Sequence, residues 1–187
     1  MELSQEEKII LLRAARASIK SIFDNKRIDE PDYDKFPKLK LKCGAFVTLT
    51  EFDKLRGCIG YIFSDLTAFR TVCNAAVQAA QNDPRFFPVT EPELDNIKIE
   101  ISLLSEPYPI NSYDEIVIGK DGLIMEEKGR RGLLLPQVPV EHNLNREQYL
   151  SAICEKTGFS KDYWKTRKIN LSGFTALVFN ENELVTE

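Results

Sequence analysis

Hydrophobic residues recur at helical spacing near the start of this 187-residue chain. Ser4 and Glu7 form a capping box, and the apolar positions that follow predict an amphipathic helix over about residues 4–24. Residues 25–40 are polar and contain two prolines, which predicts a long loop. The apolar positions of the predicted helix are Leu12, Ala15, Ile19 and Ile22.

Strand-like and helical patterns follow in the middle of the chain. Two β-rich runs between residues 43 and 63 flank a polar break at 51–54, which predicts a hairpin. A second helix is expected to end near Asn82, because Pro84 disfavours helical geometry at the preceding residue. Alternating apolar and polar residues over 97–103 predict a strand with one solvent-exposed face. The apolar positions of the second helix are Leu66, Phe69, Val72, Cys73, Ala76 and Ala80.

Three further elements complete the pattern. Residues 122–139 predict a second hairpin that turns near Lys128 and Gly129. Residues 145–158 begin with a helix-start signal and close on a glycine, which predicts a helix, and a last strand is predicted around residues 174–178. Helices and strands mix without βαβ alternation. We therefore predict an α+β fold with a mixed or antiparallel sheet and flanking helices.

The composition is that of a folded protein, and its charge narrows the candidate functions. Hydrophobic residues make up 43% and charged residues 29%, which argues against disorder, and the length suits one domain over residues 1–187. The net charge of −4 weakens the case for a nucleic-acid binder. No segment resembles a signal peptide or a membrane span, so we expect a cytoplasmic protein with reduced thiols.

The densest candidate site is the run at residues 55–60, which reads LRGCIG. On a strand, alternation places Arg56 and Cys58 on one face and predicts that Leu55 and Ile59 pack inward on the other. An arginine beside a cysteine favours the thiolate. The motif therefore predicts Arg56 as an anion contact and Cys58 as a nucleophile.

Two glycines in this motif leave space beside the strand. Gly57 and Gly60 lack side-chain bulk, which lets a backbone or a substrate approach closely. The alternative for the motif is structural, because a free cysteine such as Cys58 is most often a small buried apolar residue.

Two other charged segments are candidates. Asp83 and Arg85 flank a proline just after a helix, and they form either an acid/base and ligand-orienting pair or an ordinary surface ion pair. Arg131 lies in the run GRRG, which either presents guanidinium groups to a carboxylate or phosphate or forms a solvated hairpin tip. His142 is the only histidine, so we predict no multi-histidine metal site. The sequence contains no Walker loop and no Rossmann fingerprint, and we predict no cofactor.

The LRGCIG run resembles the hallmark of the AMMECR family. Further segments that resemble the family follow in order, among them AAQNDPRFFPVTEPEL, IEISLLSEP and IGKDGLIMEEKGRRGLLLPQV. The similarity covers roughly residues 44–179. The resemblance implies a compact α+β domain with two unequal lobes and a cleft beside the motif. It also implies an association with Memo-like proteins and radical SAM proteins as partners.

Three functions follow from these residues. The first is an enzyme or enzyme subunit acting on a small anionic substrate, with Cys58 and Asp83 catalytic and Arg56, Gly57, Gly60, Arg85 and Arg131 binding the substrate. The alternative is a non-catalytic module that docks a Memo-like or radical SAM partner. The third is nucleic-acid binding through residues 35–42 and 161–168, against which the net acidity and the lack of a binding motif count.

Overall fold

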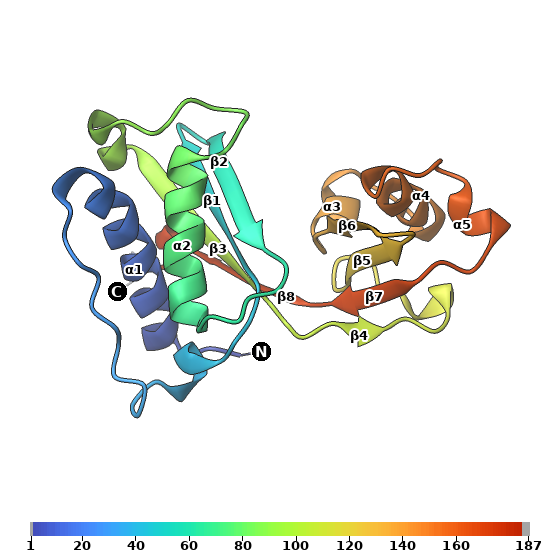
Figure 1. The fold of residues 1–187 in the computed structure, drawn as a ribbon, viewed down its shortest axis with the longest axis horizontal. Helices are drawn as coiled ribbons and strands as arrows, with labels where there is room; N and C mark the ends of the chain where they lie inside the picture. Colours follow the sequence, from blue (N-terminus) through green and yellow to red (C-terminus); the bar gives the residue numbers. More distant parts are fainter. Residues whose placement is uncertain (1, 185–187) are drawn as a thin grey trace. The chain divides into compact units, whose positions relative to one another are not determined.

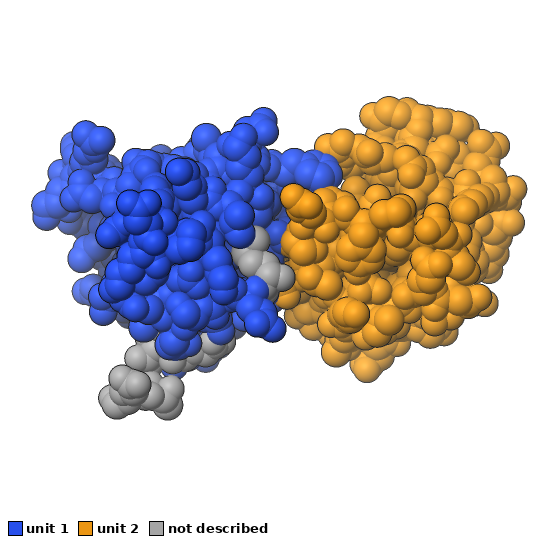
Figure 2. All heavy atoms as spheres, turned by 90° about the horizontal axis from the view of Figure 1, so that it is seen from below, with its two compact units in different colours: residues 1–104, 177–187 blue, residues 105–176 orange. Residues whose placement is uncertain are grey.

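The computed structural model describes residues 2–184, which form two compact units (Figure 1, Figure 2). Unit 1 contains the chain up to Leu104 and again from Leu177, whereas unit 2 contains Ser105–Ala176. Unit 2 is therefore inserted between the penultimate and last strands of unit 1. Each unit has its own sheet and its own hydrophobic core.

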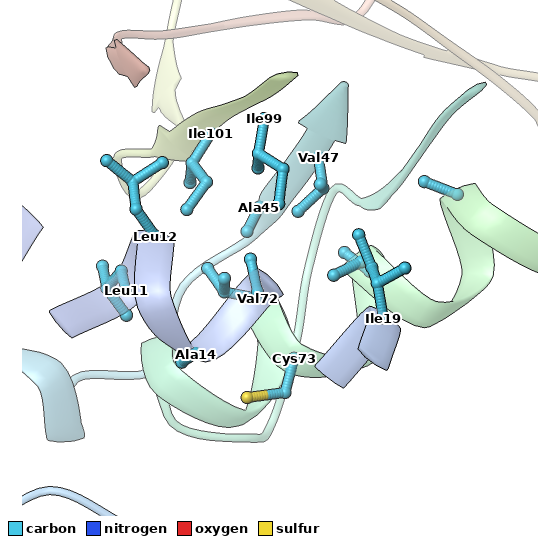
Figure 3. Close-up of a cluster of buried hydrophobic side chains, with 14 of the residues drawn as sticks. Leu11, Leu12, Ala14, Ile19, Ala45, Val47, Val72, Cys73, Ile99 and Ile101 are labelled. Carbon is cyan, nitrogen blue, oxygen red and sulfur yellow. The ribbon is translucent and has the colours of Figure 1, made fainter. Parts of the chain in front are cut away.

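Unit 1 is an antiparallel sheet with the order β2-β1-β3-β8, and two helices pack on one face of it (Figure 1). Figure 3 shows Leu12 and Val72 of the helices pointing toward Val47 and Ile101 of the strands. Alternate strand residues therefore form the core, as the periodicity predicted. The elements are α1 (Gln5–Asp24), β1 (Ala45–Glu51), β2 (Lys54–Tyr61), α2 (Ala68–Gln81), β3 (Ile97–Leu104) and β8 (Ala176–Asn180).

Unit 2 is a second antiparallel sheet, with the order β4-β7-β5-β6. Tyr149 and Ile153 of α4 are fully buried in its core with Leu123 and Met125 of β5. The elements are β4 (Tyr108–Pro109), β5 (Gly122–Glu127), β6 (Arg130–Leu134), α3 (Val138–Glu141), α4 (Arg146–Lys156), α5 (Tyr163–Thr166) and β7 (Leu171–Phe174). Short 3-10 helices cover Pro37–Lys40 (η1), Glu91–Asp95 (η2), Tyr113–Glu115 (η3) and Glu181–Leu184 (η4).

Both predicted hairpins are confirmed, and both have two-residue turns. Phe52 and Asp53 have φ values of 50° and 58°, and Lys128 and Gly129 have values of 50° and 75°. Positive φ at both central residues matches the right-handed twist of the flanking strands. The two turns therefore fix the β1–β2 and β5–β6 pairings.

The α+β prediction is confirmed, with two differences in detail. Phe174 and residues 176–178 lie in strands as predicted, but not in one strand, because the chain breaks at Thr175 and pairs as β7 in unit 2 and as β8 in unit 1. Leu66 was predicted on the second helix but precedes it, since α2 begins after the N-cap Thr67. No helix among residues 2–184 is long and apolar enough to cross a membrane.

Candidate functional site

The LRGCIG segment lies within β2, an edge strand whose pairing with β1 contains a β-bulge. The register shifts between Leu49 and Thr50, so Arg56 has no cross-strand partner. A bulge changes which face the residues beyond it point to. Leu55 is accordingly 42% exposed while Ile59 packs against the core, and the prediction that both point inward is wrong for Leu55.

The Arg56 side chain is held by the segment that follows α2. Its Nε and Nη2 donate to the two carboxylate oxygens of Glu93 at 2.6 and 3.2 Å, and its Nη1 donates to the Phe87 carbonyl at 3.0 Å. The hydrogen bonds from Arg56 are the main reason why the pKa of Glu93 is lowered to about 2. Arg56 therefore links β2 to η2, and its guanidinium group is hydrogen-bonded to Glu93 and to the Phe87 carbonyl.

The two glycines of the motif permit close packing. A Cβ at Gly57 would lie 2.2 Å from the Ala79 carbonyl oxygen of α2, and a Cβ at Gly60 would lie 2.4 Å from the Phe46 ring. Real Cβ atoms do not approach other atoms so closely. The space beside the glycines is thus filled by α2 and by an aromatic ring.

Asp83 and Arg85 form the predicted charge pair, and together they bind the main chain of Cys58. Arg85 Nη2 lies 2.7 Å from Asp83 Oδ2, and the same oxygen accepts from the Cys58 N–H at 2.8 Å. Arg85 Nη2 also reaches the Cys58 carbonyl oxygen at 3.4 Å. An edge strand presents unpaired N–H and C=O groups, and here the pair satisfies those of Cys58.

The environment of Asp83 fixes its charge. The residue is only 4% exposed, yet its pKa lies well below the usual range, chiefly because Arg85 hydrogen-bonds to the carboxylate and also because the Cys58 N–H donates to it. Hydrogen bonds to the charged form favour that form despite burial. Asp83 is therefore a fixed carboxylate rather than a ready proton acceptor.

The Cys58 side chain lies on the face of the sheet opposite the helices, here called the Cys58 face. Thr48 of β1 lies directly across from Cys58, and Glu100 of β3 lies directly across from Thr48. The Thr48 hydroxyl donates to the Cys58 sulfur at 3.3 Å. A thiol, a hydroxyl and a carboxylate therefore form one row across three strands.

Cys58 differs from the other three cysteines in its exposure. Cys43, Cys73 and Cys154 are buried, whereas Cys58 is half-buried, and all four are free thiols. Burial raises the pKa of Cys43 to about 11 and is also the main cause of the raised pKa values of Cys73 and Cys154. The buried thiols are thus poor nucleophiles at neutral pH.

The remaining predicted residues lie in unit 2. Arg131 of β6 stands opposite Glu126 of β5 and forms an ion pair with it. A hollow of about 510 Å³ lies along residues 126–131 of this hairpin. His142 is exposed at the end of α3. Within residues 2–184, no three histidine, cysteine, aspartate or glutamate side chains gather as a metal site.

Three residues of the site lie outside the sequence-based candidates. Glu93 was signalled by its capping box with Thr90, which the structure contains. Thr48 and Glu100 were signalled only by alternation in their strands, which places them on the face away from the core.

The profile of the AMMECR1 family matches residues 12–179. The chain belongs to the AMMECR1 family. A relative from Methanocaldococcus jannaschii is 40% identical over 189 residues, which cover 97% of this chain and 93% of the relative. A relative from Thermofilum pendens is 38% identical over 195 residues, with coverage of 96% and 92%.

The fold is also similar to a solved structure. An uncharacterized protein from Pyrococcus horikoshii superimposes with a TM-score of 0.82 at 38% sequence identity, and the match covers 91% of this chain and 89% of that one. The AMMECR1 resemblance read from the LRGCIG run and its flanking segments is thereby confirmed.

Proposed function

We propose that this AMMECR1-family chain is an enzyme or enzyme subunit that acts on a small anionic substrate through the thiol of Cys58. The main support is that Cys58 differs from the other polar and glycine residues of the motif in its contacts. Arg56, Gly57 and Gly60 serve the packing of β2, whereas the Cys58 side chain is half-buried on the Cys58 face. The motif thus packs β2 against its neighbours and leaves the Cys58 thiol partly exposed.

The neighbours of Cys58 support nucleophilic chemistry. The Thr48 hydroxyl donates a hydrogen bond to the Cys58 sulfur at 3.3 Å, which orients the side chain. In the proposed step the Cys58 sulfur adds to a carbonyl carbon of the substrate: the C–S bond forms as the C=O π bond breaks, and the thiol proton is transferred, by way of water, to the carbonyl oxygen. Glu100 of β3 lies at the far end of the cross-strand row, two strands away from Cys58.

Arg85 is the proposed anion contact in place of Arg56. Its side chain is 54% exposed, and its Nη2 lies against the Cys58 main chain. Asp83 holds the guanidinium in place through two hydrogen bonds, so we assign Asp83 a positioning role. That Arg131 also binds the substrate stays a prediction, as does the cytoplasmic location, which the four free thiols support.

The test is a search for covalent adducts. Wild-type protein and the Cys58→Ser variant would be incubated with a metabolite extract, and the intact masses and peptide maps would be compared. We expect an added mass on the peptide that contains Cys58, absent from the variant and reduced in Arg85→Ala. Absence of any adduct or co-purifying metabolite, or the same metabolites on both proteins, would count against a thiol-dependent reaction.

A second candidate function is the docking of a partner protein, which exposed aromatic residues near the motif favour. Phe87, whose carbonyl binds Arg56, is 90% exposed, and Phe52 at the β1–β2 turn is 73% exposed. Large exposed aromatic side chains are common at protein interfaces. The resemblance implies Memo-like and radical SAM proteins as partners. Titration calorimetry with each purified partner would test this, since Phe87→Ser should abolish binding while Cys58→Ser preserves it.

A further inference from the structure

A second charged surface lies in unit 2, between α4 and β7. Residues 156–168 contain five Lys or Arg side chains and three aromatic side chains but one acidic residue, Asp162, which pairs with Lys165. The cations are Lys156, Lys161, Lys165, Arg167 and Lys168. A basic segment interleaved with aromatic residues is typical of single-stranded nucleic-acid binding.

Two of these aromatic rings form the centre of the surface. The rings of Phe159 and Tyr163 stack with centroids 4.4 Å apart and an interplanar angle of 29°. Lys128 Nζ lies 5.7 Å from the Tyr163 ring centroid, and Arg167 Cζ lies 5.4 Å from it. Arg130 Cζ lies 5.2 Å from the Phe159 centroid. These five residues are here called the Phe159–Tyr163 surface.

The tip of the β5–β6 hairpin contacts the segment at residues 156–168. Arg130 Nη1 donates to the Gly158 carbonyl oxygen at 2.6 Å, which joins the hairpin to the turn after α4. Lys128, at the hairpin turn, extends over the Tyr163 ring. Cations from two separate parts of the sequence therefore surround one pair of rings.

The three cations of this surface form no ion pair with an acidic side chain of residues 2–184. Lys128, Arg130 and Arg167 are exposed, and none of them forms an ion pair within the part of the chain that the structure describes. Arg131, one residue along, is by contrast paired with Glu126. Cations that form no ion pair leave their charge available to an external anion.

Unit 2 does not share the net negative charge of the chain. Residues 105–176 contain ten Lys or Arg and ten Asp or Glu residues, so the whole net charge of −4 belongs to unit 1. Of the two objections to nucleic-acid binding, the net acidity therefore applies to unit 1, whereas the lack of a known binding motif applies to both units.

We propose that the Phe159–Tyr163 surface binds single-stranded nucleic acid, a function separate from the thiol chemistry proposed for unit 1. The three cations contact phosphate groups, whose neutralisation releases counterions and drives binding. Phe159 and Tyr163 are half-buried and pack against the core of unit 2, so bases would contact the exposed parts of the two rings, a contact that is tolerant of sequence because every base has a π face. An acidic peptide would use the cations but not the rings.

The test is fluorescence anisotropy with labelled single-stranded RNA and DNA of about 12 nucleotides, a length within the usual site size. The test variant is Lys128→Ala/Arg167→Ala, because neither side chain donates a hydrogen bond to another residue among residues 2–184. The matched control is Lys40→Ala/Lys42→Ala, which removes the same charge from exposed positions in unit 1. Thermal unfolding would confirm that both variants fold.

The affinity of the wild-type protein for the oligonucleotide should fall as the salt concentration rises. The test variant should bind on the order of tenfold more weakly, with a log–log salt slope smaller by about 1.4, the value for two lost phosphate contacts on a single strand. The control should bind like wild type, and the RNA and DNA arms would show which polymer is preferred. The proposal is overturned by no binding at low salt, by an equal loss in the control, or by competition from polyglutamate as effective as from an oligonucleotide of equal charge.

Discussion

The main-chain N–H of Cys58 lies 2.8 Å from Oδ2 of Asp83, a carboxylate that is itself only 4% exposed. The two residues are 25 positions apart in the sequence. Arg85 completes the contact by bonding to both Asp83 and the Cys58 carbonyl. The position of the thiol in β2 therefore depends on a charge pair in the segment after α2.

Removing the Asp83 carboxylate should destabilise the protein. Asp83→Ala leaves the Cys58 N–H without a partner and separates Arg85 from its counter-ion, so the free energy of unfolding should fall by about 1–3 kcal/mol. Urea denaturation would measure the change. Asp95→Ala, at an exposed site in η2, is the control and should stay within about 0.5 kcal/mol of wild type. An Asp83→Ala variant as stable as the control would contradict the account.

The Arg56–Glu93 pair should make stability depend on acid pH. The folded-state pKa of Glu93 is lowered to about 2 from an ordinary value of 4.5, so its contribution is fully present above pH 4.5 and is lost as the pH falls toward 2. Glu93→Gln should thus be less stable than wild type near neutral pH by on the order of 2 kcal/mol. That difference should shrink on acidification, as followed by urea denaturation across the range. A difference that stays constant with pH would refute the linkage.

Gly57 should not tolerate a methyl group. Gly57→Ala would place Cβ 2.2 Å from the Ala79 carbonyl oxygen and force β2 away from α2, at a cost of about 3 kcal/mol or more. Gly129→Ala is a useful comparison, because that glycine has a φ of 75° but no atom within 4 Å of the added Cβ. It should cost only about 1–2 kcal/mol, from backbone strain alone. Thermal denaturation of both variants decides the order, and the reverse order would be inconsistent with the packing described.

Tyr163 carries a buried hydroxyl that has no hydrogen-bond partner among the described residues. Tyr163→Phe removes this unpaired group and keeps the stacked ring, so the variant should be as stable as wild type or more stable by up to about 1 kcal/mol. Oligonucleotide binding should be unchanged, because the ring and its cations remain. A clear loss of stability in urea denaturation would mean that the hydroxyl has a partner.

Local signals in the sequence predicted the elements of the fold well. The capping boxes at Ser4 and Asn145 set the starts of α1 and α4, and helical and strand periodicity located α2 and β3. Positive φ at the two hairpin turns agrees with the polar breaks between β-rich runs. These features depend on neighbouring residues, so a single sequence contains the information.

The details of the candidate site depended on partners distant in sequence. The bulge at Arg56 follows from the pairing register with β1, which strand alternation alone does not reveal. The counter-ion of Arg56 is Glu93, 37 residues away, and the arginine that contacts Cys58 is Arg85 rather than its sequence neighbour. The division at Thr175 likewise arises because β7 and β8 join different sheets.

Residue-resolved alkylation at neutral pH tests most directly whether the Cys58 thiol is accessible and whether the Thr48 hydroxyl supports its reactivity. Iodoacetamide labelling followed by peptide mass spectrometry would give a rate for each cysteine. Cys58 should react faster than the buried Cys43, Cys73 and Cys154, and Thr48→Val, which keeps the side-chain shape but removes the hydroxyl, should slow Cys58 alone. A Cys58 that reacts no faster than Cys73 in the folded protein would contradict the nucleophile assignment and leave partner docking as the function.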